Sequence, residues 1–272
     1  MMSVIDEVSL STSVFGPEKQ PDDLLRFLET ARQAGYKYVE LSRKQLDLAR
    51  RADAIRKMGV SVWSVHGCLS SEAVSCDESV RKAAVAREID RVRDAAAFGR
   101  VPVVVHYLYR HLNPIHGENF RRSIEEIYAA SHAAGVILTI ETVPYKPQIN
   151  ERYADSAEVA AFVRSFDAED LRVTIDINHS NLREDLIQVC ANCRGLIANV
   201  HMSDNHGKWE DHLPPGEGII DFPAVFAALR ENGYTGPANL EMHAKGPVTA
   251  EWLEKSRKYV ERLLFADNPQ QK

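Results

Sequence analysis

The sequence predicts a single (β/α)8 barrel, an α/β fold in which eight parallel strands close into one sheet inside a ring of helices. Eight short apolar segments rich in β-branched residues alternate with longer segments of helical period along the whole chain. The apolar segments are nearly continuous instead of alternating with polar residues, which indicates parallel strands covered by helices. Eight such units in 272 residues average 34 residues each, and no linker rich in Pro, Gly or Ser separates them. We therefore expect one domain over residues 1–272.

The eight expected strands follow one another at regular intervals. In chain order they are Val8 to Ser13, Tyr38 to Leu41, Val60 to His66, Val101 to His106, Val136 to Glu141, Val173 to Ile177, Leu196 to His201, and Ala238 to Glu241. The competing fold, an open doubly wound sheet, needs fewer strands and often carries a glycine-rich turn after the first of them. Here that turn has one glycine, Gly16. The closed barrel is the simpler interpretation.

The segments between the strands carry apolar residues at helical spacing. Such residues recur at i, i+3, i+4 and i+7, as in a helix that buries one face on a sheet. The clearest sets are Leu24, Phe27, Leu28 and Ala31; Ile124, Ile127, Tyr128 and Ser131; and Leu253, Val260 and Leu264. A glycine precedes most of the following strands, where a left-handed residue can end a helix. These glycines are Gly35, Gly59, Gly99, Gly135, Gly195 and Gly233.

The composition excludes several classes of protein. With 44% hydrophobic and 26% charged residues, the chain is neither disordered, collagenous nor a coiled coil. Lys and Arg number 33 against 39 Asp and Glu, a net charge of -6, so no broad basic surface is expected. The loops after the strands add no cationic cluster beyond Arg43, Lys44 and Arg110. Nucleic acid is therefore an unlikely partner.

Two further features concern the cellular compartment. No segment approaches the ~18 uninterrupted apolar residues of a membrane span, and Met1 to Glu7 lack the basic start and apolar run of a signal peptide. We expect a cytoplasmic protein with no membrane partner, and the sequence leaves a homo-oligomer open. Four cysteines are too few for a disulfide scaffold. Cys190 and Cys193 form a C-x-x-C pair in an apolar, helix-like stretch, which indicates buried core thiols.

Six consecutive strands end in residues of metal-ligand type. These are His66, His106, Glu141, Asp176, His201 and Glu241. In a barrel the carboxyl ends of the strands meet at one face, where the active site is assembled. Converging carboxylates and imidazoles repel or are desolvated at a cost, whereas a divalent cation neutralises the former and accepts the lone pairs of the latter. The sequence therefore predicts a site for Mn²⁺, Co²⁺, Fe²⁺, Mg²⁺ or Zn²⁺.

Further side chains are expected at the same face. His179 follows Asp176 by three residues, and His212 lies in a long charged loop, residues 209–218, after the seventh strand. Long loops in compact domains are often functional, so we expect this one to face the substrate. Four more histidines are interpreted as surface or supporting residues: His111, His116, His132 and His243.

These residues resemble those of the xylose isomerase-like TIM barrels, in the sugar phosphate isomerase/epimerase family that is related to endonuclease IV. The resemblance covers about four fifths of the chain. It is carried, in order, by Ser64-Val65-His66-Gly67, Val104-Val105-His106, Thr139-Ile140-Glu141, Ile175-Asp176-Ile177-Asn178-His179, His201-Met202-Ser203-Asp204-Asn205, the loop from His212 through Gly216-Glu217-Gly218 to Asp221, and Gly233-Tyr234-Thr235-Gly236-Pro237 leading to Leu240-Glu241.

The resemblance implies a principal metal ion held by Glu141, Asp176, His201 and Glu241. In the trinuclear endonuclease relatives, the matching positions of His66, His106, His179, a loop carboxylate and His212 bind further zinc ions. The carboxylate position falls on Glu210 here, but that position is usually Asp, so Glu210 and Asp211 remain alternatives. These five positions are therefore expected to hold a second metal or the substrate.

The sequence departs from one subfamily of these barrels at a single position. Ketose 3-epimerases of the superfamily commonly place an Arg six residues after the histidine of the seventh strand. Here that position is Gly207, followed by Lys208. Membership of that subfamily is therefore not inferred.

The resemblance implies a metal-dependent isomerase or epimerase that acts on a sugar, sugar phosphate or related polyol-ketone through an enediolate. Glu141 and Glu241 would then exchange the proton as base and acid. His179 and His212 would orient hydroxyl groups. Aromatic walls for the sugar are expected from Tyr107, Tyr145 and Trp209.

Two alternatives use the same residues. One is an endonuclease IV-like phosphodiesterase on abasic DNA, in which the metals generate hydroxide and clamp the phosphate. The acidic net charge and the scarcity of Lys and Arg in the loops disfavour it. The other is a lyase or dehydratase that passes through the same enolate.

Overall fold

The computed structural model describes residues 5–20, 22–45, 47–108, 113–146 and 152–266. In these residues eight parallel strands form a closed barrel, in the order β1-β2-β3-β4-β5-β6-β7-β8 with β8 paired to β1. The strands are β1 (Val8–Ser11), β2 (Tyr38–Leu41), β3 (Ser61–His66), β4 (Pro102–His106), β5 (Ile137–Glu141), β6 (Leu171–Asp176), β7 (Ile197–Met202) and β8 (Ala238–Leu240). The predicted (β/α)8 barrel is confirmed, and the doubly wound sheet is excluded.

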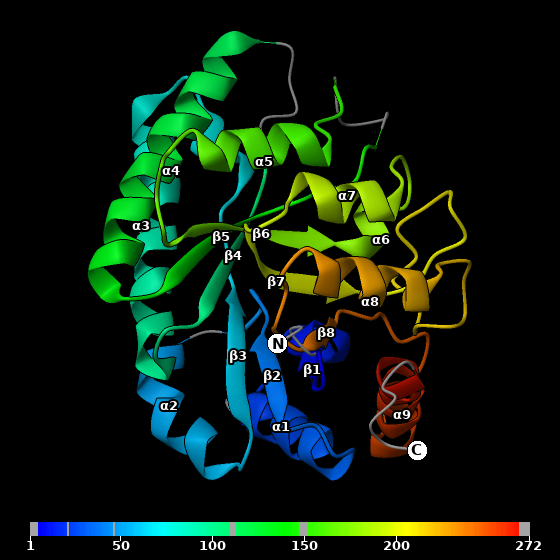
Figure 1. Ribbon diagram of the computed structural model, residues 1–272. Helices are drawn as coiled ribbons and strands as arrows, with labels where there is room; N and C mark the ends of the chain where they lie inside the picture. Colours follow the sequence, from blue (N-terminus) through cyan, green and yellow to red (C-terminus); the bar gives the residue numbers. More distant parts are fainter. Residues whose placement is uncertain (1–4, 21, 46, 109–112, 147–151, 267–272) are drawn as a thin grey trace.

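Helices surround the strands on the outside of the barrel (Figure 1). They are α1 (Asp23–Gln33), α2 (Leu48–Lys57), α3 (Glu78–Ala95), α4 (Pro114–Ala134), α5 (Ser156–Arg164), α6 (Ile177–Ser180), α7 (Leu186–Asn192), α8 (Phe222–Glu231) and α9 (Ala250–Ala266), with short 3-10 helices η1 (Thr12–Phe15), η2 (Ser71–Val74) and η3 (Ala96–Phe98). The predicted helical sets lie in α1, α4 and α9. Their buried members, such as Leu24, Leu28, Ile124 and Leu253, pack against the barrel in one hydrophobic core.

The glycines that precede strands have the predicted left-handed backbone. At the end of α4, Gly135 has φ +73 and its N–H donates to the carbonyl of His132, so it ends the helix where β5 begins. The other five predicted glycines also have positive φ. Cys190 and Cys193 are fully buried free thiols, as predicted.

All the strands except β2 differ from their predicted extents by one or two residues, and two of them end early because a side chain caps the next helix. The first strand ends at Ser11, not Ser13, because the Ser11 side chain accepts a hydrogen bond from the Ser13 N–H and caps η1. Strand β6 ends at Asp176, not Ile177, because the Asp176 side chain caps α6 by accepting from the His179 N–H. Both caps bend the chain at the carboxyl face of the barrel, where the site residues lie.

The interior of the barrel contains a polar layer. β3 has one extra residue, Trp63, between the residues paired with Val39 and Glu40, so that Ser64 lies opposite Glu40. β7 has a similar extra residue before Asn199. Such bulges re-aim side chains. Trp63 Nε1 donates to Asn199 Oδ1 at 2.9 Å, across strands that are not neighbours.

No helix among the described residues is long and apolar enough to cross a membrane.

Two residues named from the sequence, Arg110 and His111, lie outside the described residues.

Candidate metal and active site

The six predicted strand ends converge on one face of the barrel. His66, His106, Glu141 and Asp176 are the last residues of β3, β4, β5 and β6. His201 is the next-to-last residue of β7, and Glu241 directly follows β8. All but His106 and Glu241 are buried. Parallel strands of similar register bring these ends together.

Glu141, Asp176, His201 and Glu241 form the principal group. One ligand atom from each lies within 4.8 Å of the others. His201 Nδ1 lies at their centre, 3.0 Å from Glu141 Oε1, 3.1 Å from Glu241 Oε2 and 4.0 Å from Asp176 Oδ2. This is the set that the resemblance implied for the principal metal.

The charges of this group are strongly interdependent. Burial, together with the carboxylates of Glu141 and Glu241, raises the pKa of Asp176 well above its usual value. Burial also disfavours ionisation of Glu141, but His106 and His201 outweigh it and hold the Glu141 pKa well below normal. Burial opposes the charged form of His201, yet the carboxylates around it raise its pKa well above normal. Three carboxylates with so little exposure need cationic compensation.

The arrangement suits a divalent cation. Asp176 uses Oδ1 to accept the His179 N–H at 2.8 Å, whereas its buried Oδ2 accepts no hydrogen bond from the residues that the structure describes. That oxygen belongs to the group of converging ligand atoms. Three carboxylate oxygens and one imidazole nitrogen are donors that Mn²⁺, Co²⁺, Fe²⁺ and Zn²⁺ accept. The side chains present therefore fit the ion that the sequence predicts.

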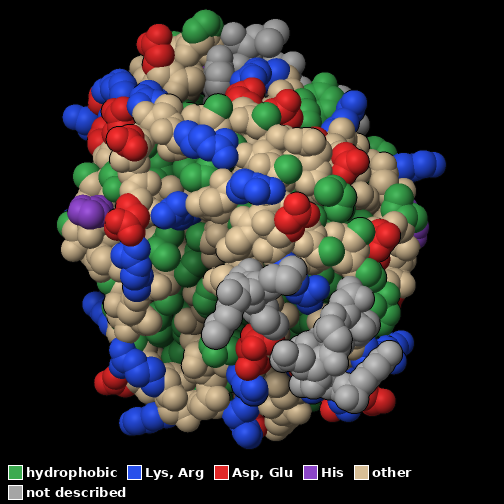
Figure 2. Space-filling view, in the orientation of Figure 1, with side chains coloured by type: hydrophobic (Ala, Val, Ile, Leu, Met, Phe, Trp, Pro, Cys, Tyr) green, Lys and Arg blue, Asp and Glu red, His purple; other side chains and the backbone are tan. Residues whose placement is uncertain are grey.

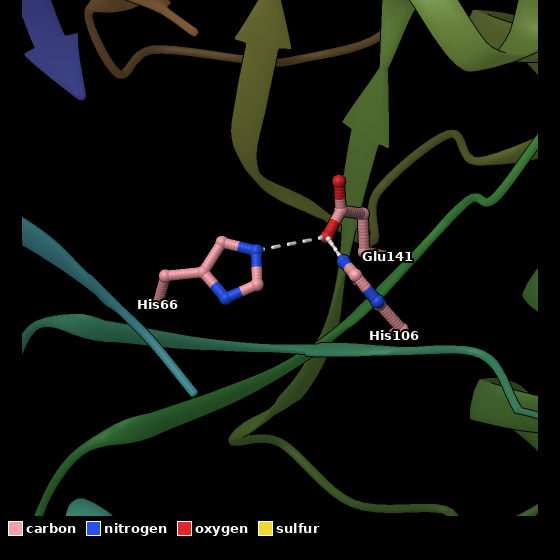
Figure 3. Close-up of side chains that lie close together, drawn as sticks. All are labelled: His66, His106 and Glu141. Carbon is pink, nitrogen blue, oxygen red and sulfur yellow. Dashed lines mark ion pairs between the residues drawn. The ribbon is translucent and has the colours of Figure 1, made fainter. Parts of the chain in front are cut away.

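A second group consists of His66, His106 and Glu141 (Figure 3). Both imidazoles point at the same carboxylate oxygen, with Nε2 of His66 at 3.5 Å and Nε2 of His106 at 3.1 Å from Glu141 Oε2. His66 Nδ1 lies 3.0 Å from the carbonyl oxygen of Gly67. When Nδ1 donates to that carbonyl, the lone pair of His66 is on Nε2, which faces Glu141.

A third group consists of His179, Glu210 and His212. Glu210 Oε2 lies 3.5 Å from His179 Nε2, and Glu210 also pairs with Lys146. Burial lowers the pKa of His179 to about 4, so its ring is neutral at pH 7. His179 Nδ1 lies 3.1 Å from the Thr142 carbonyl, which leaves Nε2 as the nitrogen that faces Glu210.

The structure decides between Glu210 and Asp211. Glu210 lines the site cavity. Asp211 instead accepts from His206, at 3.1 Å from the backbone nitrogen and 3.2 Å from Nδ1 of that residue. Glu210 is therefore the loop carboxylate of the third group.

Asp204 holds the loop that carries Glu210 and His212. Its Oδ2 accepts from the N–H groups of Gly216 and Gly218, both at 2.9 Å, and its Oδ1 accepts from the N–H of Ile220 at 3.1 Å. A Cβ on Gly218 would lie 2.3 Å from Asp204 Oδ1, so only glycine lets the loop approach this carboxylate. His212 has a left-handed backbone, with φ +48. Its Nδ1 lies 3.0 Å from the carbonyl oxygen of Glu241.

These groups surround a cavity of about 230 Å³. Its lining includes His66, His106, His179, Glu210, His212 and Glu241, together with Arg43, Lys44, Lys146 and His243. His243, interpreted from the sequence as a surface or supporting residue, places its ring 4.3 Å from that of His212. The side chains of Arg43 and Lys44 form no ion pair with any residue in the described part of the chain.

The three expected aromatic walls lie in different places. Tyr107 packs against Phe120 and Phe162, and its hydroxyl donates to Glu158 at 2.8 Å. Its ring therefore points away from the cavity, and Tyr107 is not among the described residues that line it. Tyr145 and Trp209 line an adjacent cavity of about 400 Å³, which meets the first at Lys146 and Glu210.

Glu40 on β2 was not among the site residues predicted from the sequence. Its carboxylate is fully buried, and its Oε2 lies 2.9 Å from His201 Nε2. Burial disfavours ionisation of Glu40, but His201 outweighs it and lowers the Glu40 pKa. The available signal was a lone acidic residue inside an otherwise apolar strand, Tyr38 to Leu41.

The fold and these residues together define the family. The chain belongs to the xylose isomerase-like TIM barrel family, whose model matches residues 28–263. The match includes all twelve predicted site residues.

Several curated proteins are similar in sequence. The 3-dehydro-D-guloside 4-epimerase of Escherichia coli is 34% identical over 117 residues, which cover 40% of this chain and 42% of that protein. An L-ribulose-5-phosphate 3-epimerase of Escherichia coli is 27% identical over 242 residues, covering 80% and 81%. An uncharacterised protein of Methanocaldococcus jannaschii is 29% identical over 176 residues, covering 61% and 59%. The chain thus spans less than two thirds of the first and third of these relatives.

Solved structures share the fold. A D-tagatose 3-epimerase-like protein superimposes with a TM-score of 0.81 at 21% identity, over 97% of this chain and 99% of that one. An L-ribulose 3-epimerase gives a TM-score of 0.80 at 20% identity, over 98% and 95%. At these identities the likeness establishes the barrel architecture.

Proposed function

We propose that this protein is a metal-dependent isomerase or epimerase of a sugar, sugar phosphate or related polyol-ketone. The proposal depends most on the pair Glu141 and Glu241. Their carboxylates lie 3.0 Å and 3.1 Å from His201 Nδ1, in a group of side chains that fits a divalent cation. Relatives of this chain named as sugar 3- and 4-epimerases support it. A cytoplasmic location remains a prediction from the sequence, which leaves a homo-oligomer open.

The principal ion would be held by Glu141, Asp176, His201 and Glu241. When bound, such an ion polarises a carbonyl oxygen and makes the adjacent C–H more acidic. The protein's own task is then to move one proton. One glutamate removes the proton from the carbon beside the carbonyl, and the other returns a proton. An epimer results when the proton returns to the opposite face of the same carbon.

The surroundings of the two glutamates suit this exchange. His66 and His106 hold Glu141 from one side, and Glu241 borders the cavity with 12% of its side chain exposed. His179 and His212 line the same cavity and would orient substrate hydroxyl groups. Tyr145 and Trp209 would offer an apolar wall at the outer edge of the site, beyond Lys146.

The cavity favours a small, anionic substrate. Its volume of about 230 Å³ is below the roughly 300–1,000 Å³ of pockets for drug-sized ligands. Arg43 and Lys44 line it from the segment after β2, without an acidic partner among the described residues. Two cationic side chains beside an acidic site attract a negative group on the far end of a substrate. A sugar phosphate fits this distribution of charge.

The second and third groups are proposed as sites for a further metal or for substrate hydroxyl groups. They consist of His66, His106 and Glu141, and of His179, Glu210 and His212. Three groups of ligands in one cavity also favour a second candidate, the phosphodiesterase on abasic DNA, because trinuclear relatives use the same positions. The lyase or dehydratase remains the alternative that shares the enolate.

The proposal is tested by isotope exchange. The protein with Mn²⁺ or Co²⁺ is incubated in deuterated water with a panel of ketoses, ketose phosphates and keto-glycosides, and products are analysed by NMR. A substrate should gain deuterium at the carbon beside its carbonyl, because a carboxylate base exchanges its proton with solvent between turnovers. Product without deuterium would point to a hydride shift and would remove the two-glutamate mechanism. No turnover of any panel member, with a phosphodiester substrate cleaved instead, would reverse the order of the candidates.

A further inference from the structure

A buried carboxylate lies beneath the candidate metal site, inside the barrel. Glu40 is on β2, and its Oε2 accepts hydrogen bonds from Ser64 Oγ at 2.7 Å and from Asn239 Nδ2 at 3.0 Å. Asn199 Nδ2 lies 3.4 Å from the same oxygen. The extra residues in β3 and β7 bring Ser64 and Asn199 into these positions. Three other strands therefore direct donors to one oxygen of Glu40.

The imidazole of His201 connects Glu40 to the principal group. His201 Nε2 lies 2.9 Å from Glu40 Oε2, and Nδ1 lies 3.0 Å from Glu141 Oε1 and 3.1 Å from Glu241 Oε2. In a neutral imidazole one nitrogen carries the hydrogen and the other offers a lone pair. A hydrogen on Nε2, donated to Glu40, leaves the lone pair on Nδ1. That nitrogen then faces the carboxylates of the principal group.

We propose that Glu40 is a positioning residue of the metal site, which fixes the ring orientation and tautomer of His201 so that Nδ1 is presented to the cation. The inference rests on the metal site of the proposed function. A carboxylate that accepts the second N–H of a ligand histidine also makes the ligand nitrogen more basic. Glu40 acts only through His201, because it is fully buried and is not among the described residues that line the cavity.

A purely structural role for Glu40 makes a different prediction. If it served only to join the strands, its replacement would change stability and leave metal binding intact. Oε1 of Glu40 accepts no hydrogen bond within the described residues. In Glu40→Gln the amide oxygen can therefore keep the existing donors while the NH2 group takes the place of Oε1. The substitution preserves the shape of the side chain and removes its charge.

The experiment measures Co²⁺ binding by metal-free wild type and Glu40→Gln, in competition with a chromophoric chelator, and records the visible absorption of bound Co²⁺. We expect roughly 10–100-fold weaker binding in Glu40→Gln, the usual effect of losing such a partner, and a changed absorption spectrum. Ser64→Ala is the matched control, because it removes another donor to the same oxygen without touching His201. It should bind Co²⁺ nearly as wild type does, with the wild-type spectrum.

Wild-type affinity together with an unchanged spectrum in Glu40→Gln would overturn the inference, and so would an equal loss in Ser64→Ala. A wild-type protein that binds no Co²⁺ would overturn the proposed function along with it. A second measurement avoids the variant altogether, in case Glu40→Gln does not fold. In wild type labelled with 15N-histidine and loaded with Zn²⁺, NMR should show His201 protonated on Nε2 and ligated through Nδ1. The reverse assignment would contradict the inference.

Discussion

Individual residues of the site differ in how the chain holds them. Glu141 is fully buried between imidazoles of three strands, whereas Glu241 directly follows β8 and reaches the cavity. The N–H of Glu241 donates to the Met202 carbonyl, and its own carbonyl lies 3.0 Å from His212 Nδ1. Its backbone is therefore fixed, while its carboxylate lines the cavity, where it would meet the proposed metal and substrate. A substitution at Glu241 is therefore better suited than one at Glu141 to change the reaction without disturbing the fold.

We predict that Glu241→Gln folds, binds metal more weakly and loses at least about 10²-fold in turnover, the usual scale for a positioned acid or base. The change is nearly isosteric but removes one anionic ligand and one titrating group. Circular dichroism checks the fold, and the deuterium exchange assay checks the rate at saturating metal. A variant that turns over at the full wild-type rate would refute the role of Glu241.

Most residues of the candidate site could be predicted from the sequence, because the sequence shows where each strand ends. Each of the six ligand-type residues ends or borders a buried strand, so the barrel alone brings them together. Glu40 could not be found this way, since its role depends on side chains from β3, β7 and β8 that meet only in the closed barrel. Tyr107 was expected at the cavity, but it follows His106, and successive side chains of an extended strand point to opposite sides. Its ring consequently lies against Phe120 and Phe162.

At the scale of elements, the loop after β7 is the part of the site that depends most on side-chain bonding. The strands hold their residues by ladders of backbone hydrogen bonds, whereas the segment from Gly216 to Ile220 is tied to Asp204 by three N–H groups. Asp204 also pairs with Leu213 through two backbone hydrogen bonds, of 2.8 and 2.9 Å. Asp204 thus holds the loop that carries His212 through both its carboxylate and its backbone.

We predict that Asp204→Ala destabilises the fold by at least about 2 kcal/mol, because it leaves several loop N–H groups without their acceptor, at roughly 1–3 kcal/mol for each buried group. Urea unfolding measures the loss. Asp211→Ala is the control, since Asp211 lies on the same loop but its carboxylate pairs with the exposed His206. Equal free energies of unfolding for the two variants would show that Asp204 does not stabilise the loop in this way.

Element boundaries were predicted less well than element types. The alternation of apolar runs and helical periods identified every strand, and the glycines marked the helix ends. The ends of β1 and β6 were misplaced because Ser11 and Asp176 use their side chains to cap the next helix. Whether a Ser or Asp caps a helix or continues a strand depends on its backbone angles, which hydrophobic spacing does not specify.

At the scale of the whole molecule, the charge distribution bears on the choice between sugar and DNA. On the face shown in Figure 2, Lys and Arg are interspersed with Asp and Glu, and no continuous basic band crosses it. The net charge of -6 agrees with this pattern. A protein that tracks a nucleic-acid backbone needs a concentrated positive surface.

We predict that the metal-loaded protein does not nick duplex DNA with an abasic site above the rate of a control with metal alone. Gel electrophoresis of an end-labelled duplex measures incision at low salt, where any electrostatic binding is strongest. Incision that requires the protein and disappears in Glu241→Gln would make the phosphodiesterase the preferred function.

The last prediction concerns the competition between metal and protons for the whole site. In the metal-free protein, the raised pKa values of Asp176 and His201 mean that both groups retain protons at pH values where ordinary carboxyl and imidazole groups have lost them. Ligation requires the deprotonated forms, so metal binding must release these protons. Metal affinity should therefore fall as the pH is lowered, by up to about tenfold per pH unit for each proton displaced.

Calorimetry with Mn²⁺ in buffers of different ionisation enthalpy counts the protons released, and repeated titrations at several pH values give the dependence of affinity on pH. Since a ligand that binds only the folded state stabilises it, a chelator should also lower the melting temperature, and less so at acid pH where the site already holds protons. Metal binding with no proton release and no pH dependence would show that the cation binds elsewhere than at Asp176 and His201.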